Sequence, residues 1–205
     1  LVNLIENATC QVGGALADRT TLMVVNALSD LAMDDKNKVA IEIAGGILPL
    51  VDLMRIGATE IVAAAAAAAL GNLAYDNVDN AVLIVRVGGI PPLIELTSSG
   101  TDTTKQSAVQ ALTFLSEDEV PDDNRVTIVA AGGIAPLVEL TRSGTAIAKM
   151  RAATTLYNLI KHSTEHEAAI VAAGGIPAFI ELTRTGNAEA KERAATTLKY
   201  FSATE

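Results

Sequence analysis

The chain has 205 residues, of which 50% are hydrophobic and only 3% aromatic, and it contains no Trp. A core of this composition is built from small and aliphatic side chains, which favours closely stacked helices. The net charge of −9 argues against a surface that follows nucleic-acid phosphates, because such a surface needs an excess of Lys and Arg. We therefore expect no nucleic-acid partner.

Cysteine content and apolar runs indicate where the protein works. The single Cys10 can form no internal disulfide, and the Cys and His residues make up no zinc-ligand set, which is typical of a reducing compartment. We expect a cytoplasmic or, alternatively, a nuclear location. The run 61–70 is mostly alanine and shorter than the roughly 18 residues that a bilayer span needs, so no direct membrane insertion is expected. With no initiator Met, the chain is interpreted as an excised domain.

The first 34 residues are predicted to be a partial repeat, because their start matches a later second helix and their end a later third helix. Leu4 and Leu28 are 24 residues apart, whereas the corresponding Leu pairs of later repeats are 16 apart. About eight extra residues therefore place an insertion at 7–18, and a smaller insertion of about two residues falls in 117–124. Each insertion is interpreted either as loop variation or as a partner-contacting loop.

Four similar strings follow in chain order: AGGILPLVDL, VGGIPPLIEL, AGGIAPLVEL and AGGIPAFIEL. Their Gly pairs begin at Gly45, Gly88, Gly132 and Gly174, at intervals of 43, 44 and 42 residues. This period is longer than that of tetratricopeptide and ankyrin repeats, which have about 34 and 33 residues. It falls within the roughly 40 to 47 residues of armadillo and HEAT repeats. The repeat boundaries predicted from it are 35–76, 77–117, 118–162 and 163–205.

Each repeat is predicted to hold three helices. A short helix such as 37–44 ends at the Gly pair, where left-handed backbone favours glycine. Pro49, Pro92 and Pro136 then stand in the first turn of a second helix, which needs no amide hydrogen there and ends at the glycine eight residues later. A longer amphipathic third helix follows, for example 102–116. The sequence therefore predicts an all-α, right-handed superhelix with about 42 residues per repeat.

The repeated pattern Asn-x-x-x-Ile, Ala-Gly-Gly-Ile-Pro-x-Leu-Val-x-Leu and Ala-Ala-x-x-Leu-x-Asn-Leu resembles the armadillo family over nearly the whole chain. Asn37, Asn80 and Asn124 stand eight residues before their Gly pairs, and His166 replaces Asn in the last repeat. The style is closest to the regular repeats of plant, algal and protist armadillo proteins, including vacuolar anchoring proteins and plant U-box ligases.

The resemblance implies that the third helices line a concave surface that binds partners. Matched positions on these helices form three rows. One row contains Asp30, Asn72, Phe114, Asn158 and Tyr200; the others lie four and seven residues earlier in each helix. The candidate partner-binding residues from these rows are Asn26, Asp30, Asn72, Gln110, Phe114, Arg151, Thr154, Asn158, Arg193 and Tyr200.

In the family, the Asn of the first row hydrogen-bonds the main chain of an extended peptide, since one amide offers a donor and an acceptor. The resemblance gives this role to Asn72 and Asn158, while Asp30, Phe114 and Tyr200 depart from the pattern. The Trp that karyopherin alpha proteins place four residues before this Asn is absent from every repeat. Recognition of nuclear-import signals is therefore not expected.

Charge and aromatic residues suggest where a partner binds. Residues 1–141 carry a net charge of −11 and residues 142–205 carry +2. Arg151 and Arg193 are predicted to attract an acidic or acidic-aromatic peptide near the C-terminal end, or else to be ordinary solvated helix charges. Phe114 and Tyr200 are candidate anchors, because exposed aromatic side chains are enriched at interfaces.

The sequence contains only weak matches to motifs for metal binding, phosphate binding or catalysis. His162 and His166 have the spacing of two metal ligands on a helix, but they are predicted to lie in a solvated loop with no third ligand. The Gly pairs lack the context of a phosphate loop, and Cys10 has no recognisable base partner. We expect no catalytic, cofactor-binding or metal-binding residues, and no enzyme activity.

Two functions remain open at this point. The first is a protein-interaction module that binds an extended peptide or partner segment along the concave surface. The alternative is a structural segment of a longer scaffold or cytoskeletal armadillo protein, with no ligand in the groove. Because terminal repeats normally carry a polar cap and none is evident here, weak end-to-end self-association is also expected.

Overall fold

The computed structural model describes residues 15–55, 59–161 and 163–203. Within these residues the chain forms thirteen α-helices and no strand, which confirms the predicted all-α class. The helices recur in sets of three. The first helices of the sets are short and are α3 (Asp35–Ile43), α6 (Val78–Arg86), α9 (Asp122–Ala130) and α12 (Thr164–Ala172).

The second helices pack beside the third helices of the same set. The second helices are α4 (Ile47–Arg55), α7 (Ile90–Ser99), α10 (Ile134–Ser143) and α13 (Gly175–Thr185). The third helices are longer and are α2 (Ala15–Leu31), α5 (Glu60–Ala74), α8 (Asp102–Phe114), α11 (Ala146–Ile160) and α14 (Ala188–Ala203).

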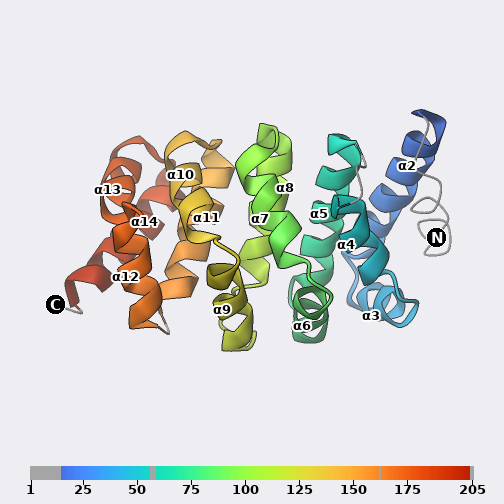
Figure 1. Ribbon diagram of the computed structural model, residues 1–205, viewed down its shortest axis with the longest axis horizontal. Helices are drawn as coiled ribbons and strands as arrows, with labels where there is room; N and C mark the ends of the chain where they lie inside the picture. Colours follow the sequence, from blue (N-terminus) through green and yellow to red (C-terminus); the bar gives the residue numbers. More distant parts are fainter. Residues whose placement is uncertain (1–14, 56–58, 162, 204–205) are drawn as a thin grey trace.

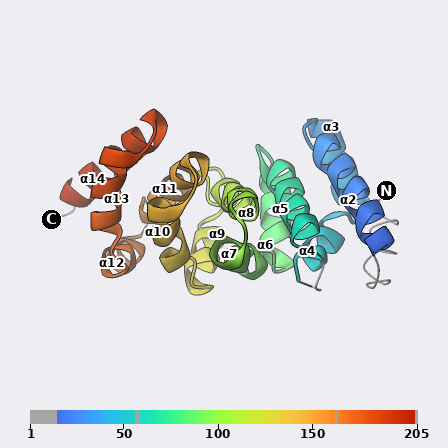
Figure 2. The same ribbon diagram turned by 90° about the horizontal axis from the view of Figure 1, so that it is seen from above.

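The sets stack into an elongated arc with α2 at one end and α14 at the other (Figure 1). Seen from above, α5, α8 and α11 form one row and α4, α7 and α10 form a second row beside it (Figure 2). Helix α5 packs between α2 and α8, and α11 packs between α8 and α14. The third helices therefore form one continuous side of the solenoid.

Short polar side chains begin several helices. Asn77 accepts a hydrogen bond from the Asn80 amide nitrogen at 2.9 Å at the start of α6, and Ser163 accepts one from the His166 amide nitrogen at 3.2 Å at the start of α12. Thr145 caps α11 in the same way, through the Ala148 amide nitrogen at 3.2 Å. These bonds satisfy amide groups that have no partner within the helix.

The Gly pairs end the first helices, as predicted. Gly88 and Gly132 have φ angles of +80° and +81°, in the left-handed region that favours glycine. The amide nitrogen of Gly133 then donates to the Ile128 carbonyl oxygen at 3.0 Å. A Cβ at Gly133 would lie 2.8 Å from that same oxygen, so the second glycine is required by close approach rather than by φ.

The core lies between the stacked helices. Leu70, Leu112 and Leu156 occupy the same position in three successive third helices and are fully buried. A Cβ at Gly71 of α5 would lie 3.4 Å from the Ala111 backbone of α8, so small residues allow these helices to approach closely. Within the alanine run 63–69, Ala66, Ala67 and Ala69 are fully buried, so this part of the run packs in the core.

The structure bears in part on the predicted insertion, the last repeat and the repeat boundaries. The insertion at 7–18 lies outside the described residues, except that 15–18 belong to the backbone of α2. Phe201 in the last repeat is only 7% exposed, and the centre of its ring lies 6.2 Å from that of Phe179. The exact boundaries between repeats stay predictions.

No single helix among the described residues is both long and apolar enough to cross a membrane. Two bent pairs, α6 with α7 and α9 with α10, pass that test only when each pair is taken together, by length and composition.

Candidate functional site

Two hollows open on the side of the solenoid formed by the third helices. The larger has a volume of about 420 Å³ and extends across α2, α5 and α8. The smaller, of about 230 Å³, lies between α11 and α14. Hollows on this side are what a surface that binds an extended partner requires.

The two rows nearer the helix starts line these hollows. Asn26 lines the larger hollow, and Thr154 and Arg193 line the smaller one. The Thr154 hydroxyl donates to the Met150 carbonyl oxygen of its own helix at 3.0 Å. Gln110 is half-buried and lines neither of these hollows.

The first row differs from the expectation, because its amides are used between repeats. Asn72 donates to the carbonyl oxygen and the hydroxyl of Ser29 in α2, both at 3.1 Å. Asn158 is 8% exposed and donates to the Ser116 hydroxyl at 3.3 Å. Asn158 is therefore far less exposed than expected, since stacking of neighbouring repeats covers most of the side chain, and its binding to a peptide stays a prediction.

Phe114 is likewise not the exposed aromatic expected from its row. It is 7% exposed, and its ring meets the ring of Tyr75 edge-on at 5.0 Å. Tyr200 is half-buried, with its ring 6.5 Å from that of Tyr157 and its hydroxyl donating to the Lys161 carbonyl oxygen at 3.4 Å. Asp30 alone in this row is exposed. The row mainly joins one repeat to the next.

Both candidate arginines lie over aromatic rings. The Arg151 guanidinium is 5.1 Å from the centre of the Phe114 ring, and that of Arg193 is 5.1 Å from the centre of the Tyr157 ring. Each Arg contacts the preceding repeat, and both residues are half-buried. The face of an aromatic ring attracts a cation, so these contacts hold both guanidinium groups in place. The two Arg side chains therefore differ from charges that are free in solvent.

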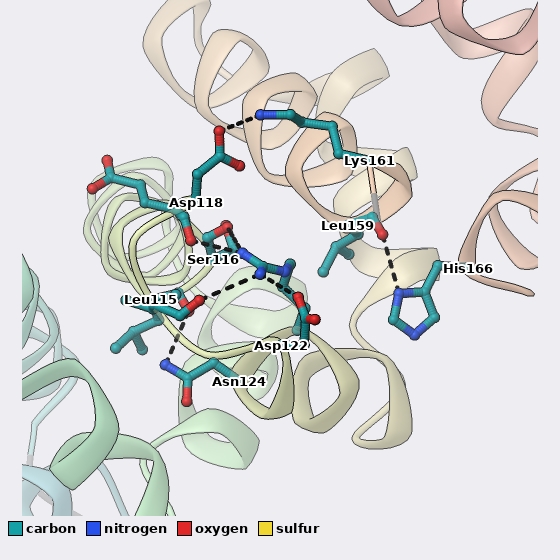
Figure 3. Close-up of polar contacts among 11 residues, drawn as sticks. Leu115, Ser116, Asp118, Asp122, Asn124, Leu159, Lys161 and His166 are labelled. Atoms are coloured by element: carbon teal, nitrogen blue, oxygen red, sulfur yellow. Dashed lines mark hydrogen bonds and ion pairs between the residues drawn. The ribbon is translucent and has the colours of Figure 1, made fainter. Parts of the chain in front are cut away.

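A carboxylate-rich segment lies next to Arg151. Burial raises the pKa of Glu117 to about 7, and the negative charges of Glu119 and Asp76 add to the shift, while Arg151 opposes it. Asp118, in the same segment, forms an ion pair with Lys161, which follows α11 (Figure 3). The segment that follows α8 therefore carries a carboxyl group, that of Glu117, whose pKa lies near neutral pH.

The recurring polar position of the first helices binds the preceding third helix. Asn124 donates to the Leu115 carbonyl oxygen at 3.2 Å, and His166 contacts the Leu159 carbonyl oxygen through Nδ1 at 3.1 Å (Figure 3). Asn80 makes the same bond to Leu73 at 3.0 Å. The prediction of a solvated loop is therefore wrong for His166, which is buried in α12; His162 lies outside the described residues.

Sequence reasoning missed the role of Arg125. This side chain is buried, and its guanidinium donates to the carbonyl oxygens of Ser116 at 3.1 Å, Glu117 at 2.7 Å and Val120 at 3.3 Å, and pairs with Asp122. These acceptors fold the small insertion at 117–124 against α9. The only sequence signal for this role is that Arg125 directly follows Asn124 in the repeat that carries the small insertion.

No group of three or more His, Cys, Asp or Glu residues that could hold a metal ion is found in the described part of the chain. The arrangement as a whole defines a class of protein: an α-solenoid of stacked three-helix repeats with an elongated side lined by the third helices.

The comparisons find similarity to armadillo-repeat proteins. Residues 163–203 match the family described as Armadillo/beta-catenin-like repeat. An engineered protein of known structure is 29% identical with a TM-score of 0.84, over 95% of this chain and 77% of that one. The armadillo repeats only protein from Plasmodium falciparum is 23% identical with a TM-score of 0.75, over 86% of this chain and 78% of that one. The chain has the fold of an armadillo-repeat solenoid.

A designed armadillo repeat protein solved in complex with the peptide (KR)4 has the same fold, with a TM-score of 0.80 at 19% identity over 95% of this chain and 78% of that one. A search of the curated proteins finds no match to this sequence.

Proposed function

We propose that this chain is a protein-interaction module that binds an extended peptide or partner segment along the side lined by α2, α5, α8, α11 and α14. The observation that carries the proposal is the position of the two hollows, which both open on this side and involve all five helices. Designed proteins of the same fold include one described for modular peptide recognition and one in complex with a peptide, which supports a peptide as the partner.

Near the C-terminal end, the proposed partner segment is acidic or acidic-aromatic. The support is the pair of ring-held guanidinium groups of Arg151 and Arg193, together with the net charge of +2 on residues 142–205. The Asn158 side chain is 8% exposed and its amide nitrogen bonds to Ser116, so the proposal for this segment rests on the two Arg residues instead. Replacing both Arg residues by Gln should slow association and reduce its salt dependence, because peripheral charges mainly steer encounter.

The experiment that tests the module starts from peptides selected from a random display library on the immobilised chain. Their affinity is then measured by calorimetry for Ser107→Glu, Thr154→Glu and Thr196→Glu, which place a charge on the proposed surface. The matched control is Thr164→Glu on α12, an exposed Thr away from that surface. At least one surface variant should weaken binding about tenfold while the control does not. Selected peptides that respond to none of the three would overturn the module.

A second candidate function is a structural segment of a longer scaffold. Val51, Ile94 and Val138 are 0%, 7% and 1% exposed, and the first two lie close to the Gly pairs of the following repeats. Ile180 holds the same position in the last repeat and is 50% exposed. This open face fits a further repeat packed against α13, with the groove unoccupied. Two results together would favour the scaffold: no selected peptide binds the groove, and the chain associates with another repeat through the face around Ile180.

Armadillo solenoids are in general binding scaffolds rather than enzymes. The absence of catalysis, the absence of a cofactor and the cytoplasmic or nuclear location stay predictions for this chain.

A further inference from the structure

Helix α5 carries the smallest side chains of the proposed binding surface. Of the five α5 residues that line the larger hollow, three are alanine. The equivalent residues of α11 and α14 are larger and line or flank the smaller hollow. The two sets are Ala64, Ala65 and Ala68 in α5, against Met150, Arg151 and Thr154 in α11 and Glu192, Arg193 and Thr196 in α14. The low floor over α5 explains why the larger hollow lies there.

The floor of this hollow is apolar and its rim is polar. Beside the three alanine methyl groups, Leu22 of α2 and Ile61 of α5 line it, and Ile61 is 66% exposed. The rim carries the amide of Asn26 and the hydroxyls of Thr103 and Ser107. An apolar floor with a few polar groups around it is the arrangement that binds an apolar side chain while its main chain finds hydrogen-bond partners.

One charged residue, Glu60, is among the eleven that line the hollow. The Thr101 amide nitrogen and the Thr104 hydroxyl donate to Glu60 Oε1, the latter at 2.9 Å. These bonds, the Thr101 one first, lower the pKa of Glu60, so its carboxylate is negative at neutral pH. Arg19 of α2 and Lys105 of α8 do not line the hollow.

We propose that this hollow, made by α2, α5 and α8, is the anchor pocket for one bulky apolar side chain of a bound peptide, with a basic residue next to it facing Glu60. The inference rests on the proposed peptide-binding function and adds the chemistry of its partner. The apolar residue removes the exposed surface of Ile61 and the alanine floor from water. The basic neighbour complements Glu60 and the net charge of −11 on residues 1–141.

Three dye-labelled peptides test the proposal by fluorescence anisotropy. Each alternates lysine and serine; the first has one central phenylalanine, the second alanine in its place, and the third keeps phenylalanine but has glutamate for lysine. The first peptide should bind about tenfold more tightly than either of the others. Equal binding of the phenylalanine and alanine peptides would overturn the anchor pocket. Equal binding of the lysine and glutamate peptides would overturn the basic neighbour.

Ala68→Leu fills the floor of the hollow and should weaken the first peptide about tenfold. The equivalent positions hold Gln110 and Thr154, so the solenoid accepts a larger residue there; Ala65→Met is a second variant of the same kind. The matched control is Thr164→Leu on α12, an exposed Thr away from the proposed surface, which should leave the affinity unchanged.

The outcomes separate this inference from the function on which it rests. Binding that responds to Thr154→Glu or Thr196→Glu, but not to Ala68→Leu or Ala65→Met, would overturn the anchor pocket and leave the peptide-binding module standing. Self-association of the chain that disappears in Ala68→Leu would identify a second copy as the occupant and overturn the proposal.

Discussion

At the scale of single residues, one side chain in each of three first helices holds the preceding repeat. Asn80, Asn124 and His166 contact carbonyl oxygens near the ends of α5, α8 and α11. The last carbonyl groups of a helix have no partner within it, so a side-chain donor from the next helix satisfies one of them. His serves in place of Asn because Nδ1 can occupy the position of the amide nitrogen.

His166→Ala should lower the free energy of unfolding by about 1–3 kcal/mol, because the Leu159 carbonyl oxygen loses this buried donor. His166→Asn restores the residue found in the other repeats and should recover most of the loss. Urea denaturation followed by circular dichroism measures both. Equal losses in the two variants would mean that ring packing, not the hydrogen bond, is what His166 contributes.

Glu117 makes stability depend on pH. Its pKa rises from 4.5 to about 7 in the folded chain, so the folded state retains a proton that the unfolded state releases between these values. The free energy of unfolding therefore falls as the pH rises from about 4.5 to about 7 through this group. Glu117→Gln should be more stable than the wild type at pH 8, by about 1 kcal/mol or less because the side chain is partly exposed to solvent.

Thermal denaturation at pH 5 and pH 8 measures this difference. Glu119→Gln is the matched control, because Glu119 is exposed and acts on Glu117 only through its charge. Glu119→Gln should therefore be stabilised at pH 8 by less than Glu117→Gln. A pH dependence identical in wild type and Glu117→Gln would contradict the assignment.

At the scale of the helix, the first glycine of each pair sets the turn between the first and second helices. Gly132 has a φ of +81°, and a Cβ added there would have no atom within 4 Å, so backbone strain is the only penalty for a side chain at this position. Gly132→Ala should destabilise the chain by about 1 kcal/mol.

Gly132→Asn is the matched comparison, since Asn enters the left-handed region more readily than Ala. It should cost less than Gly132→Ala when both are measured by urea denaturation. A larger loss for Asn would show that side-chain size, and not backbone conformation, limits this position.

At the scale of the whole molecule, the last repeat leaves a packing face open. Ile180 and Ala195 are exposed, whereas their equivalents Ile94 and Val109 are buried against the next repeat or within the stack. We predict weak, concentration-dependent association in sedimentation velocity that Ile180→Glu abolishes. Val126→Glu, at an equally exposed position of α9, is the control and should leave it unchanged. A monomer at every accessible concentration would contradict the prediction.

The sequence by itself determined the repeat and the helices within it. Positive φ at Gly45, Gly88, Gly132 and Gly174 follows from local backbone sterics, and the spacing of Leu and Ala follows from the helical period, so both are visible without a structure. The period of the Gly pairs also identified the solenoid class.

Only the tertiary structure decided which row of the third helices is used in contacts between repeats. Asn72, Phe114 and Asn158 are turned into contacts with Ser29, Tyr75 and Ser116, residues about one repeat earlier in the chain. Such contacts depend on how far neighbouring helices are staggered, which no local pattern records. The hollow over α5 arises for the same reason: small side chains create an open space only where the flanking helices stand close enough to form its walls.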